Sequence, residues 1–460
     1  MNRCGDPVTC NASSSSGVSD DVGGQGSPVQ ATASASGPVR GDFGKFWVGQ
    51  SISNLGSSIT LFALPLLVYE LTGSAVNLAL TTAVQFVPHL LFGLIIGAYV
   101  DRLDRKKLMI TVDLLRVVVI STIPLMAALD SLTVSWIYGT GFVMSILTIF
   151  FDSSQFAAIP SLVSEKDLVT ANGRIQASFA GAQIAGPLAA GLLVSVLPIS
   201  GVVLVDASTF LISAFSLAAI KKRFNLVERD TTSPSSLWSD VMEGLRYVMR
   251  HPVLRDISLM LALANLLAAP IYSQVILFAD VQLNASRSET AFIYATGALG
   301  MMLFGLMAGR IRKRFSFSTV AKWALIIESC LYVVFALMTN VWLAMIVFGL
   351  MQGHGILFNV QTSSLRQLIT PNQILGRVMS IAAVLAWSAI PLGSYLGGLA
   401  IEATGRPDQI YAILGGVSLI IPLFFFTFTE LKRAEKHILG TEVEADQPTI
   451  NLPDNRLSAS

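Results

Sequence analysis

Residues 97–107 read GAYVDRLDRKK, and residues 305–314 read GLMAGRIRKR. Each stretch follows a long apolar segment and ends in a cluster of basic side chains. The chain as a whole is 53% hydrophobic and only 13% charged, whereas soluble chains average about 25% charged residues. This composition is typical of a chain solvated by lipid, so an integral membrane protein is predicted.

Outward from these two stretches, the apolar segments number twelve, and each is long enough to cross a bilayer as a helix, which takes about 20 residues. They lie near 46–69, 76–100, 108–129, 134–159, 175–197, 202–220, 257–279, 291–309, 319–338, 341–360, 378–401 and 410–428. Of the 30 Lys and Arg residues, 23 lie in every second gap or in the C-terminal tail, and only Arg287 and Arg406 lie in the alternate gaps. Basic side chains are retained on the cytoplasmic side during insertion, so both termini are predicted to be cytoplasmic.

The sequence divides into five predicted segments. They are a disordered cytoplasmic tail at 1–42, a six-helix half at 43–220, a cytoplasmic linker at 221–256, a second six-helix half at 257–430 and a cytoplasmic tail at 431–460. In the linker, Trp238, Val241, Met242 and Leu245 recur at helical spacing, which predicts an amphipathic helix. This helix could pack on the cytoplasmic ends of the other helices or lie on lipid.

The two halves resemble each other. The stretches at 97 and 305 are separated by about 208 residues. A second match, at nearly the same separation, pairs Asn172-Gly173-Arg174-Ile175 with Leu375-Gly376-Arg377-Val378. Two matches on the predicted cytoplasmic side indicate a duplicated six-helix unit in one membrane orientation, an arrangement typical of transporters that bind substrate between the halves near the midplane. The predicted fold is therefore an all-α membrane protein with two parallel six-helix repeats.

The stretch at 97–107 resembles the signature of the major facilitator superfamily, which has the form G-x-L-a-D-R-x-G-R-K, and the resemblance covers roughly 43–430. Tyr99 and Asp104 depart from the signature. The residues that match it are Gly97, Asp101, Arg102, Arg105 and Lys106. The resemblance implies a transporter of twelve helices in a bacterial inner membrane.

Asp101 is the residue in this loop that orientation alone does not explain. Its carboxylate is placed to accept hydrogen bonds at a helix N-terminus or to pair with an arginine across the halves. Such a latch would hold the cytoplasmic side closed. Gly309 occupies the corresponding position in the second half, so the latch is expected to be lopsided. The alternative is that the charges of this loop only set the orientation of the protein in the membrane. That alternative explains the basic residues but does not explain the acidic side chain of Asp101.

The fifth predicted span indicates which branch of the superfamily the sequence resembles. Its sequence, AQIAGPLAAG at 182–191, is similar to the g-x-x-x-G-P-x-x-G-G signature of exporters in the superfamily, carried here by Gly186, Pro187 and Gly191. Small residues and one proline permit a kinked, close-packed helix. The neighbouring sequence resembles the branch that includes bacterial macrolide efflux pumps and the enterobactin exporter, which implies export.

Ionisable residues inside a bilayer are costly and each is a functional hypothesis. Asp113 and Arg116 are three residues apart on one helical face and are predicted to form a charge pair with a structural or gating role, with substrate binding as the alternative. Glu328 lies near the midplane, where it could take up and release a proton or remain a neutral acid bonded to a neighbouring helix. Asp152 and Asp206 lie nearer the ends of their spans and are further proton-coupling candidates.

The resemblance also implies a substrate cavity lined by the first, fourth, seventh and tenth spans. Polar residues on these spans are the expected substrate contacts. They are Gln50, Asn54, Ser57, Ser145, Thr148, Asn265, Gln274, Gln352, His354 and Asn359.

No nucleotide-binding loop, nucleophile motif or metal-ligand cluster occurs in the sequence, so neither an enzyme nor a cofactor or metal is predicted. The net charge of +1 gives no reason to expect nucleic acid binding. The predicted function is export of an amphipathic small molecule, such as an antibiotic or a siderophore-like metabolite, by proton antiport and alternating access. The predicted partners are that substrate, membrane lipid and protons, and the protein is expected to be a monomer. A solute importer or lipid flippase is the alternative, and a sensor is a more distant one.

Overall fold

A computed structural model describes residues 41–100, 103–164, 167–222, 224, 237–371 and 374–434, all of which belong to one compact unit formed by residues 39–460. Every regular element in this part of the chain is a helix. The all-helical membrane fold predicted from the sequence is confirmed.

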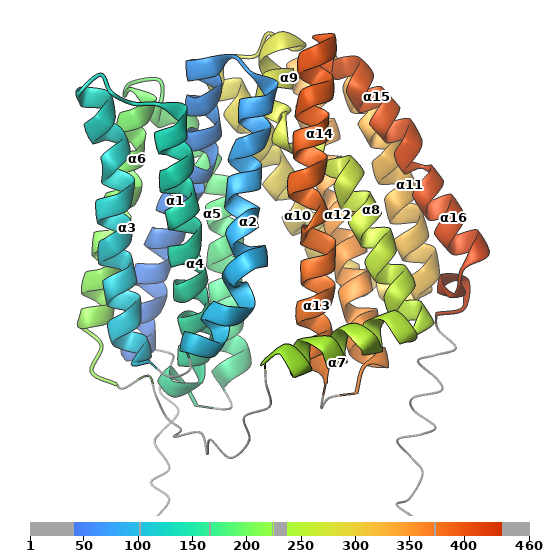
Figure 1. The fold of residues 1–460 in the computed structure, drawn as a ribbon, viewed down its shortest axis with the longest axis horizontal. Coiled ribbons are helices and arrows are strands. Elements are labelled where there is room, and N and C mark those ends of the chain that lie inside the picture. Colours follow the sequence, from blue (N-terminus) through green and yellow to red (C-terminus); the bar gives the residue numbers. More distant parts are fainter. Residues whose placement is uncertain are drawn as a thin grey trace, which may run out of the picture. The chain divides into compact units, whose positions relative to one another are not determined.

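Six long helices make up the described part of the first half, and Figure 1 shows how they are arranged. They are α1 (Asp42–Thr72), α2 (Ala75–Val100), α3 (Arg105–Ala128), α4 (Val134–Leu162), α5 (Leu168–Leu193) and α6 (Ile199–Ala218). Within this half α1 packs against α5 and α6, and α3 packs against α4 and α6.

The second half also has six predicted spans, but it contains more helices than the first half. They are α7 (Leu237–Arg250), α8 (Pro252–Ser273), α9 (Val275–Val281), α10 (Arg287–Arg314), α11 (Phe317–Ala336), α12 (Val341–Ile369), α13 (Leu375–Trp387), α14 (Ala389–Thr404), α15 (Pro407–Ser418), α16 (Ile420–Phe428) and the short 3-10 helix η2 (Glu430–Arg433). Three predicted spans are broken, at Gln274, Ser388 and Leu419, which the sequence patterns did not predict.

A proline lies near each of these breaks, at Pro270, Pro391 and Pro422. Proline has no backbone N–H, so the carbonyl four residues earlier loses its helical hydrogen bond. Pro270 precedes the break in α8, and α14 uses the space at this kink. A Cβ atom on Gly393 of α14 would overlap the backbone carbonyl of Leu266, which is the carbonyl that Pro270 leaves free. The kink therefore lets α14 pack closely against α8.

Helix ends are fixed by local hydrogen bonds. The carboxylate of Asp104 accepts from the backbone N–H of Lys107 at 3.1 Å and caps α3. Ser286 and Glu289 form a reciprocal capping box at the start of α10. Gly73 and Gly405 end α1 and α14 with positive φ angles, a backbone conformation that glycine adopts without strain.

Eleven of the described helices, counting broken pairs together, are long and apolar enough to cross a membrane. The predicted fifth span, α5, falls outside this group, because Gly, Ala and Gln side chains dominate its sequence. This helix packs against α1 in its own half and against α10 in the other half. A helix covered by protein on two sides needs less apolar surface than one that faces lipid.

Helix α7 lies across the end of the second half, at the bottom of Figure 1. We call this end of the unit the inner end and the opposite one the outer end. Gly244 allows close contact with Ile381 of α13, and Glu243 pairs with Arg377 at 2.5 Å. Met242 and Met249 are each 45% exposed. One face of α7 thus packs on the protein's own helices, while the methionines project away from them.

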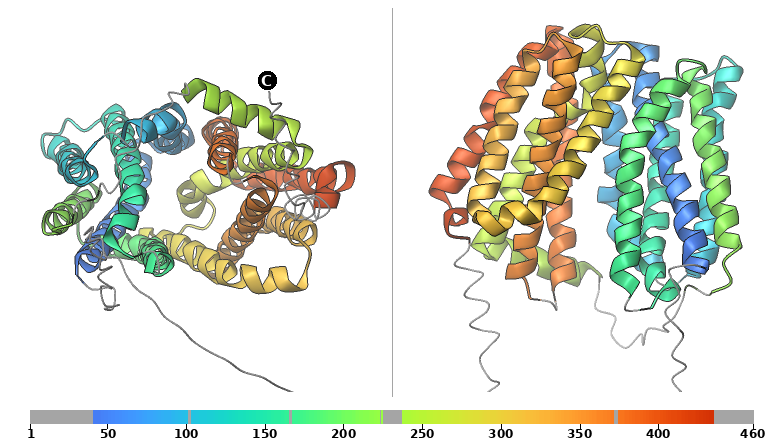
Figure 2. Two further views of the ribbon diagram at one scale, coloured as in Figure 1. Left: turned by 90° about the horizontal axis from the view of Figure 1, so that it is seen from below. Right: turned by 180° about the vertical axis from the view of Figure 1, so that it is seen from behind.

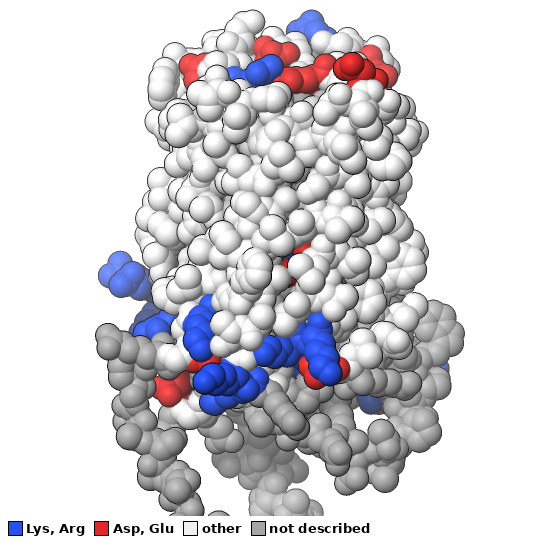
Figure 3. All heavy atoms as spheres, turned by 90° about the vertical axis from the view of Figure 1, so that its left-hand side faces the viewer, with Lys and Arg blue, Asp and Glu red and all other residues white. Residues whose placement is uncertain are grey.

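Charged side chains gather at the two ends of the unit. Figure 3 shows Lys and Arg concentrated at the inner end of one face, Asp and Glu predominating at the outer end, and a belt almost free of charge between them. This distribution is typical of a protein that crosses a bilayer.

Candidate functional site

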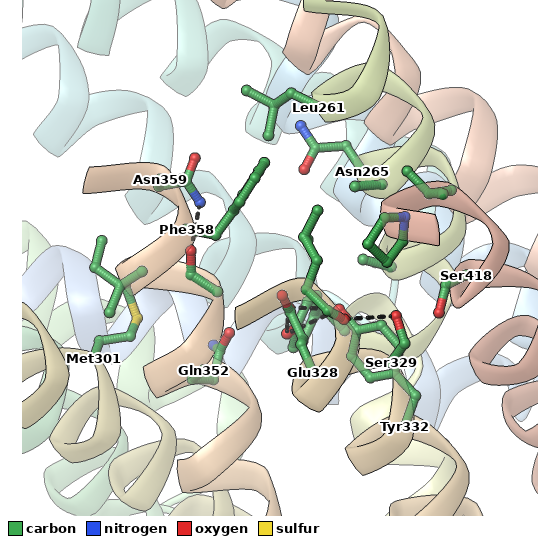
Figure 4. Close-up of a pocket in the computed structure, with 18 residues that line it drawn as sticks. Leu261, Asn265, Met301, Glu328, Ser329, Tyr332, Gln352, Phe358, Asn359 and Ser418 are labelled. Atoms are coloured by element: carbon green, nitrogen blue, oxygen red, sulfur yellow. Dashed lines mark hydrogen bonds between the residues drawn. The ribbon is translucent and has the colours of Figure 1, made fainter. Parts of the chain in front are cut away.

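The second half contains a cavity of about 130 Å³ among α8, α10, α11, α12, α15 and α16, here called the Glu328 pocket (Figure 4). Its walls are mostly apolar, and among the described residues that line it there is no Lys, Arg or His. The polar lining residues are Asn265, Tyr272, Glu328, Ser329, Tyr332, Gln352, Asn359 and Ser418.

Glu328 is buried in this pocket, with 7% of its surface exposed. Its Oε1 atom accepts a hydrogen bond from the hydroxyl of Tyr332 at 2.6 Å and another from the hydroxyl of Tyr272 at 3.0 Å. Gly355 of α12 makes room for this arrangement, since a Cβ atom there would come within 3.0 Å of Oε1. One carboxylate oxygen is thus bonded to two phenols. The hydrogen bond from Tyr272 joins α8 to α11.

The side-chain amides of two asparagines also line this pocket. Asn265 donates from its side-chain nitrogen to the carbonyl of Ala386 at 2.8 Å, and Asn359 donates to the carbonyl of Gly355 at 3.0 Å. Both amides therefore bond backbone carbonyls through nitrogen. Figure 4 shows Asn265 and Asn359 on different sides of the cavity.

The first half contains a cavity of about 270 Å³ among α1, α2, α4, α5 and α6, here called the Asp206 pocket. Four of the predicted cavity residues, Asn54, Ser57, Ser145 and Thr148, line it. Its other polar lining residues are Ser58, Thr60, Gln85, His89, Gln183 and Asp206.

Asp206 is buried where α6 meets α1. Its Oδ1 atom accepts from the hydroxyls of Thr209 at 3.2 Å and Ser57 at 3.4 Å. Gly56 permits this approach, because a Cβ atom there would lie 2.8 Å from the same oxygen. Asp152, one turn beyond Thr148 on α4, is exposed and does not line this pocket.

A third cavity lies between the halves and links the first two through shared side chains. Ser58, Leu61 and Gln183 line both this junction pocket and the Asp206 pocket. Met301 and Gln352 line both the junction pocket and the Glu328 pocket. The two carboxyl groups therefore lie in cavities that meet at the interface of the halves.

Polar contacts join the halves at the outer end. Tyr69 donates to Asp280 at 2.8 Å, and Glu70 pairs with Arg287. Glu402 accepts from the Ser74 hydroxyl at 2.5 Å and from the backbone N–H of Val76 at 3.0 Å. Figures 1 and 2 show the ribbons of the halves close together at this end and farther apart toward the inner end.

Three residues predicted to line the cavity lie elsewhere. Gln50 is buried inside the first half, where it donates to Ser213 at 2.8 Å. Gln274 is buried at the outer contact of the halves and donates to the carbonyl of Ala75 at 2.7 Å. His354 packs on the ring of Phe304 with centroids 4.8 Å apart. Polar residues in a membrane bundle mark any interior face, and these three face helix contacts rather than a cavity.

Asp113 and Arg116 contact each other, at 3.4 Å, inside the first half. The Asp113 carboxylate also accepts from Ser213 at 2.6 Å, and the guanidinium of Arg116 lies 4.6 Å from the ring centroid of Phe151. With Gln50 bonded to Ser213, the network connects α1, α3, α4 and α6. The guanidinium of Arg116 also lies 5.2 Å from the ring centroid of Phe210, which lines the Asp206 pocket.

Basic residues after α2 contact the end of α6. Lys106 donates to the carbonyls of Ile220 at 2.6 Å and Ala218 at 3.3 Å, and Arg105 approaches the carbonyl of Phe224 at 3.5 Å. These contacts stay within the first half and satisfy carbonyls at a helix C-terminus. Asp101 and Arg102 lie outside the described residues. Gly97 lies within α2. Because Asp101 is not described, the latch stays a prediction.

Glycines of α5 and α14 make matching contacts. Gly186 packs on Ser58 of α1 within the first half, and Gly191 packs on Ala291 of α10 across the halves. Each of these glycines has a counterpart 207 residues later in the sequence. Gly393, the counterpart of Gly186, packs on α8 within the second half, and Gly398, the counterpart of Gly191, packs on Ala79 of α2 across the halves. Pro187 lines the junction pocket. The duplication noted in the sequence thus extends to the helix contacts.

Sequence reasoning missed the two tyrosines that bond Glu328. Tyr332 follows Glu328 by four residues on one helical face, a spacing that could have identified it. Tyr272 lies on a different span, and nothing in its local sequence points to Glu328.

A helical bundle whose two halves repeat the same packing contacts, with polar cavities in each half that meet between them, defines a transporter of the major facilitator fold. The model of the transmembrane secretion effector family matches residues 33–456. The chain belongs to this family of the major facilitator superfamily, which confirms the resemblance noted in the sequence.

Curated relatives include efflux pumps. Macrolide efflux protein A of Streptococcus pyogenes is 27% identical over 402 residues, which cover 85% of this chain and 97% of that protein. The multidrug efflux pump Tap of Mycolicibacterium fortuitum is 25% identical over 393 residues, which cover 80% and 92%. Among solved structures, the nucleoside transporter NupG aligns with a TM-score of 0.68 at 13% identity, over 84% of this chain and 99% of that one, which supports the fold alone.

Proposed function

We propose that this protein exports an amphipathic small molecule, such as an antibiotic or a siderophore-like metabolite, across a bacterial inner membrane. Both termini and α7 would then be cytoplasmic, in agreement with the basic loops at the inner end. Two relatives that span nearly their whole length with this chain are efflux pumps for macrolides or several drugs. Their direction of transport supports export over the alternatives of import and lipid flipping.

One observation carries the proposal of alternating access. The Asp206 and Glu328 pockets meet in the junction pocket between the halves, while hydrogen bonds and an ion pair join the halves at the outer end. A substrate in these cavities would be closed off from the outer side. Release to the outer side would require Glu70, Asp280 and Glu402 to lose their partners in the opposite half. The protein is proposed to do this as a monomer.

Proton antiport is proposed to drive the cycle, with Glu328 as the first candidate for the coupling residue. Its carboxyl group is buried beside the junction and bonds only phenols among the described residues. Asp206 occupies a comparable place in the first half, and exposed Asp152 could pass protons toward the inner end. Binding and release of a proton at a buried carboxyl group changes the charge that the helices must accommodate.

The test is an accumulation assay in a sensitive bacterial host, with and without the protein. A panel of antibiotics that includes macrolides is added, and cell-associated drug is measured before and after a protonophore. Export by proton antiport predicts lower accumulation with the protein, restored by the protonophore. Higher accumulation with the protein would instead support import. Equal accumulation of every compound would contradict both.

A further inference from the structure

We propose that a groove between α1 and α5 binds one anionic phospholipid from the leaflet at the inner end, with the guanidinium of Arg174 as the partner of the lipid phosphate. In the orientation proposed above, this is the cytoplasmic leaflet. The inference concerns a bound lipid and does not depend on which substrate the protein moves.

The groove follows the contact between α1 and α5 and has a volume of about 350 Å³. On α1 its lining extends from Trp47 to Leu55, and on α5 it extends from Ser178 to Ala185. At a helical rise of 1.5 Å per residue, the lining on α1 is about 12 Å long. Small side chains leave the groove open on the α5 side, since Ala185 is exposed and no atom lies within 4 Å of a Cβ atom placed on Gly181. Its length and depth suit part of an acyl chain.

Polar groups gather at the inner end of this groove. The indole N–H of Trp47 donates to the hydroxyl of Ser178 at 2.7 Å and to the backbone carbonyl of Arg174 at 3.2 Å. The hydroxyl of Ser51 donates to Ser178 at 2.8 Å. The guanidinium of Arg174 lies 5.8 Å from the ring centroid of Trp47. A cation therefore lies beside the end of the groove that is nearest the membrane surface, where a lipid carries its phosphate.

No acid neutralises this arginine within the described part of the chain. None of the ion pairs formed there includes Arg174. Lys45, also near the inner end of α1, is by contrast paired with Asp42 at 3.0 Å. A guanidinium presents its donors in a planar fork that matches the oxygens of a phosphate, so Arg174 is suited to an anionic headgroup.

The second half shows an anion at the corresponding place. Arg377 is the counterpart of Arg174 in the repeated Gly-Arg motif, 203 residues later. The carboxylate of Glu243 on α7 pairs with Arg377, and Gly244 brings α7 against the same arginine. Among the described residues, no helix precedes α1 in the way that α7 precedes α8. The membrane can supply the missing anion to the first half, because anionic headgroups attract basic side chains at its surface.

Trp47 provides the reporter, because it lines the groove. The other five of the six tryptophans are replaced by phenylalanine in the full-length protein, which is reconstituted in phosphatidylcholine vesicles. Increasing fractions of phosphatidylglycerol or phosphatidylcholine with brominated acyl chains are added, and quenching of the indole fluorescence is measured. Phosphatidylglycerol should be preferred about fivefold, as expected for one basic side chain at an anionic headgroup. A protein that keeps only Trp342, which is 61% exposed at the outer end, should be quenched equally by both lipids.

The decisive variant is Arg174→Gln, which should abolish the preference at Trp47. Arg377→Gln is the matched control, because it removes the corresponding charge from the second half, and it should keep the preference. Arg174→Lys covers the case in which the glutamine variant does not fold, and it should retain most of the preference. If the reporter protein shows no preference for phosphatidylglycerol, or if Arg174→Gln retains it, the proposal is overturned.

A further variant tests the groove without changing a charge. Ala185→Phe fills the end of the groove that is farthest from Arg174 and should reduce the preference at Trp47. An unchanged preference would show that the acyl chain does not lie in the groove and would overturn the site. Soluble glycerol 3-phosphate at millimolar concentration should leave the preference unchanged. If it removes the preference, Arg174 binds a phosphate alone and the lipid site is wrong.

Discussion

Buried charges in this protein fall into two kinds according to their partners. The Asp113 carboxylate pairs with the guanidinium of Arg116 and accepts a hydrogen bond from the hydroxyl of Ser213, both within the first half. Among the described residues, Glu328 accepts hydrogen bonds only from phenols, and it lines a cavity. A carboxyl group with a fixed cationic partner stabilises one arrangement of helices, whereas one without such a partner is free to exchange its ligand. We therefore propose that the partners of a buried charge, rather than its depth in the membrane, distinguish a structural role for Asp113 from a transport role for Glu328.

At this scale, the Asp113–Arg116 pair gives a stability prediction. Arg116→Leu leaves the Asp113 carboxylate buried without its cation and should lower the free energy of unfolding by about 3–5 kcal/mol. The double variant Asp113→Asn with Arg116→Leu should recover more than half of this loss, because no charge remains. Thermal unfolding of the purified protein in detergent measures both. Arg406→Gln, at an exposed pair in an outer loop, is the control and should hardly change the melting temperature. If the double variant is no more stable than Arg116→Leu, the pair is not the source of the loss.

At the scale of elements, α5 and α14 occupy corresponding places in the two halves. Each uses one glycine to pack within its own half and a second glycine to reach the other half. Pro187 and Pro270 lie beside these contacts, at the junction pocket and at the kink of α8. Because a glycine contact has no side chain to unlock, helices can separate there and meet again at low cost.

The cross-half contact of α5 gives the second prediction. Gly191→Leu would place a large side chain against Ala291 and should shift the equilibrium toward separation at the outer end by about 1–2 kcal/mol, or roughly 5–30-fold in population. Gly181→Leu, on the same helix with no atom near its Cβ position, is the matched control. The readout is labelling of Ala298→Cys in the junction pocket by an impermeant thiol reagent added from outside, with the native cysteines replaced by serine. Equal labelling rates in the two variants would show that the contact at Gly191 does not close the outer side.

At the scale of the whole molecule, the distribution of charge sets the orientation. Basic residues begin α3, end α10 and also lie in α7, and all of these are at the inner end. The outer loops carry Arg287 and Arg406, and each is paired with an acid, Glu70 and Asp408 respectively. The outer end therefore has little uncompensated positive charge to oppose translocation.

Orientation gives the third prediction. Ser131→Cys in the outer loop after α3 should react with an impermeant thiol reagent in intact cells, whereas Phe315→Cys in the loop after α10 should react only after the cells are permeabilised. Both positions are exposed, so a difference between them reports sidedness. The native cysteines are again replaced by serine. Labelling of Phe315→Cys in intact cells would reverse the topology, and with it the cytoplasmic placement of α7.

The sequence by itself determined the membrane class, the all-helical fold, the duplication and the family, but not the breaks within three of the spans. Each of these depends on hydropathy, on charge counts or on short motifs, which are properties of the chain read in order. It also predicted Asn54, Ser57, Ser145, Thr148, Asn265, Gln352 and Asn359, which line the cavities.

Only the tertiary structure decided which way each polar side chain faces. In water a polar stripe marks the solvent side of a helix, but in a bilayer both helix contacts and cavities are interior, so the stripe does not distinguish them. Gln50, Gln274 and His354 therefore could not be separated from true cavity residues. The two phenols on one oxygen of Glu328 come from different helices, and their meeting depends on how α8 packs against α11.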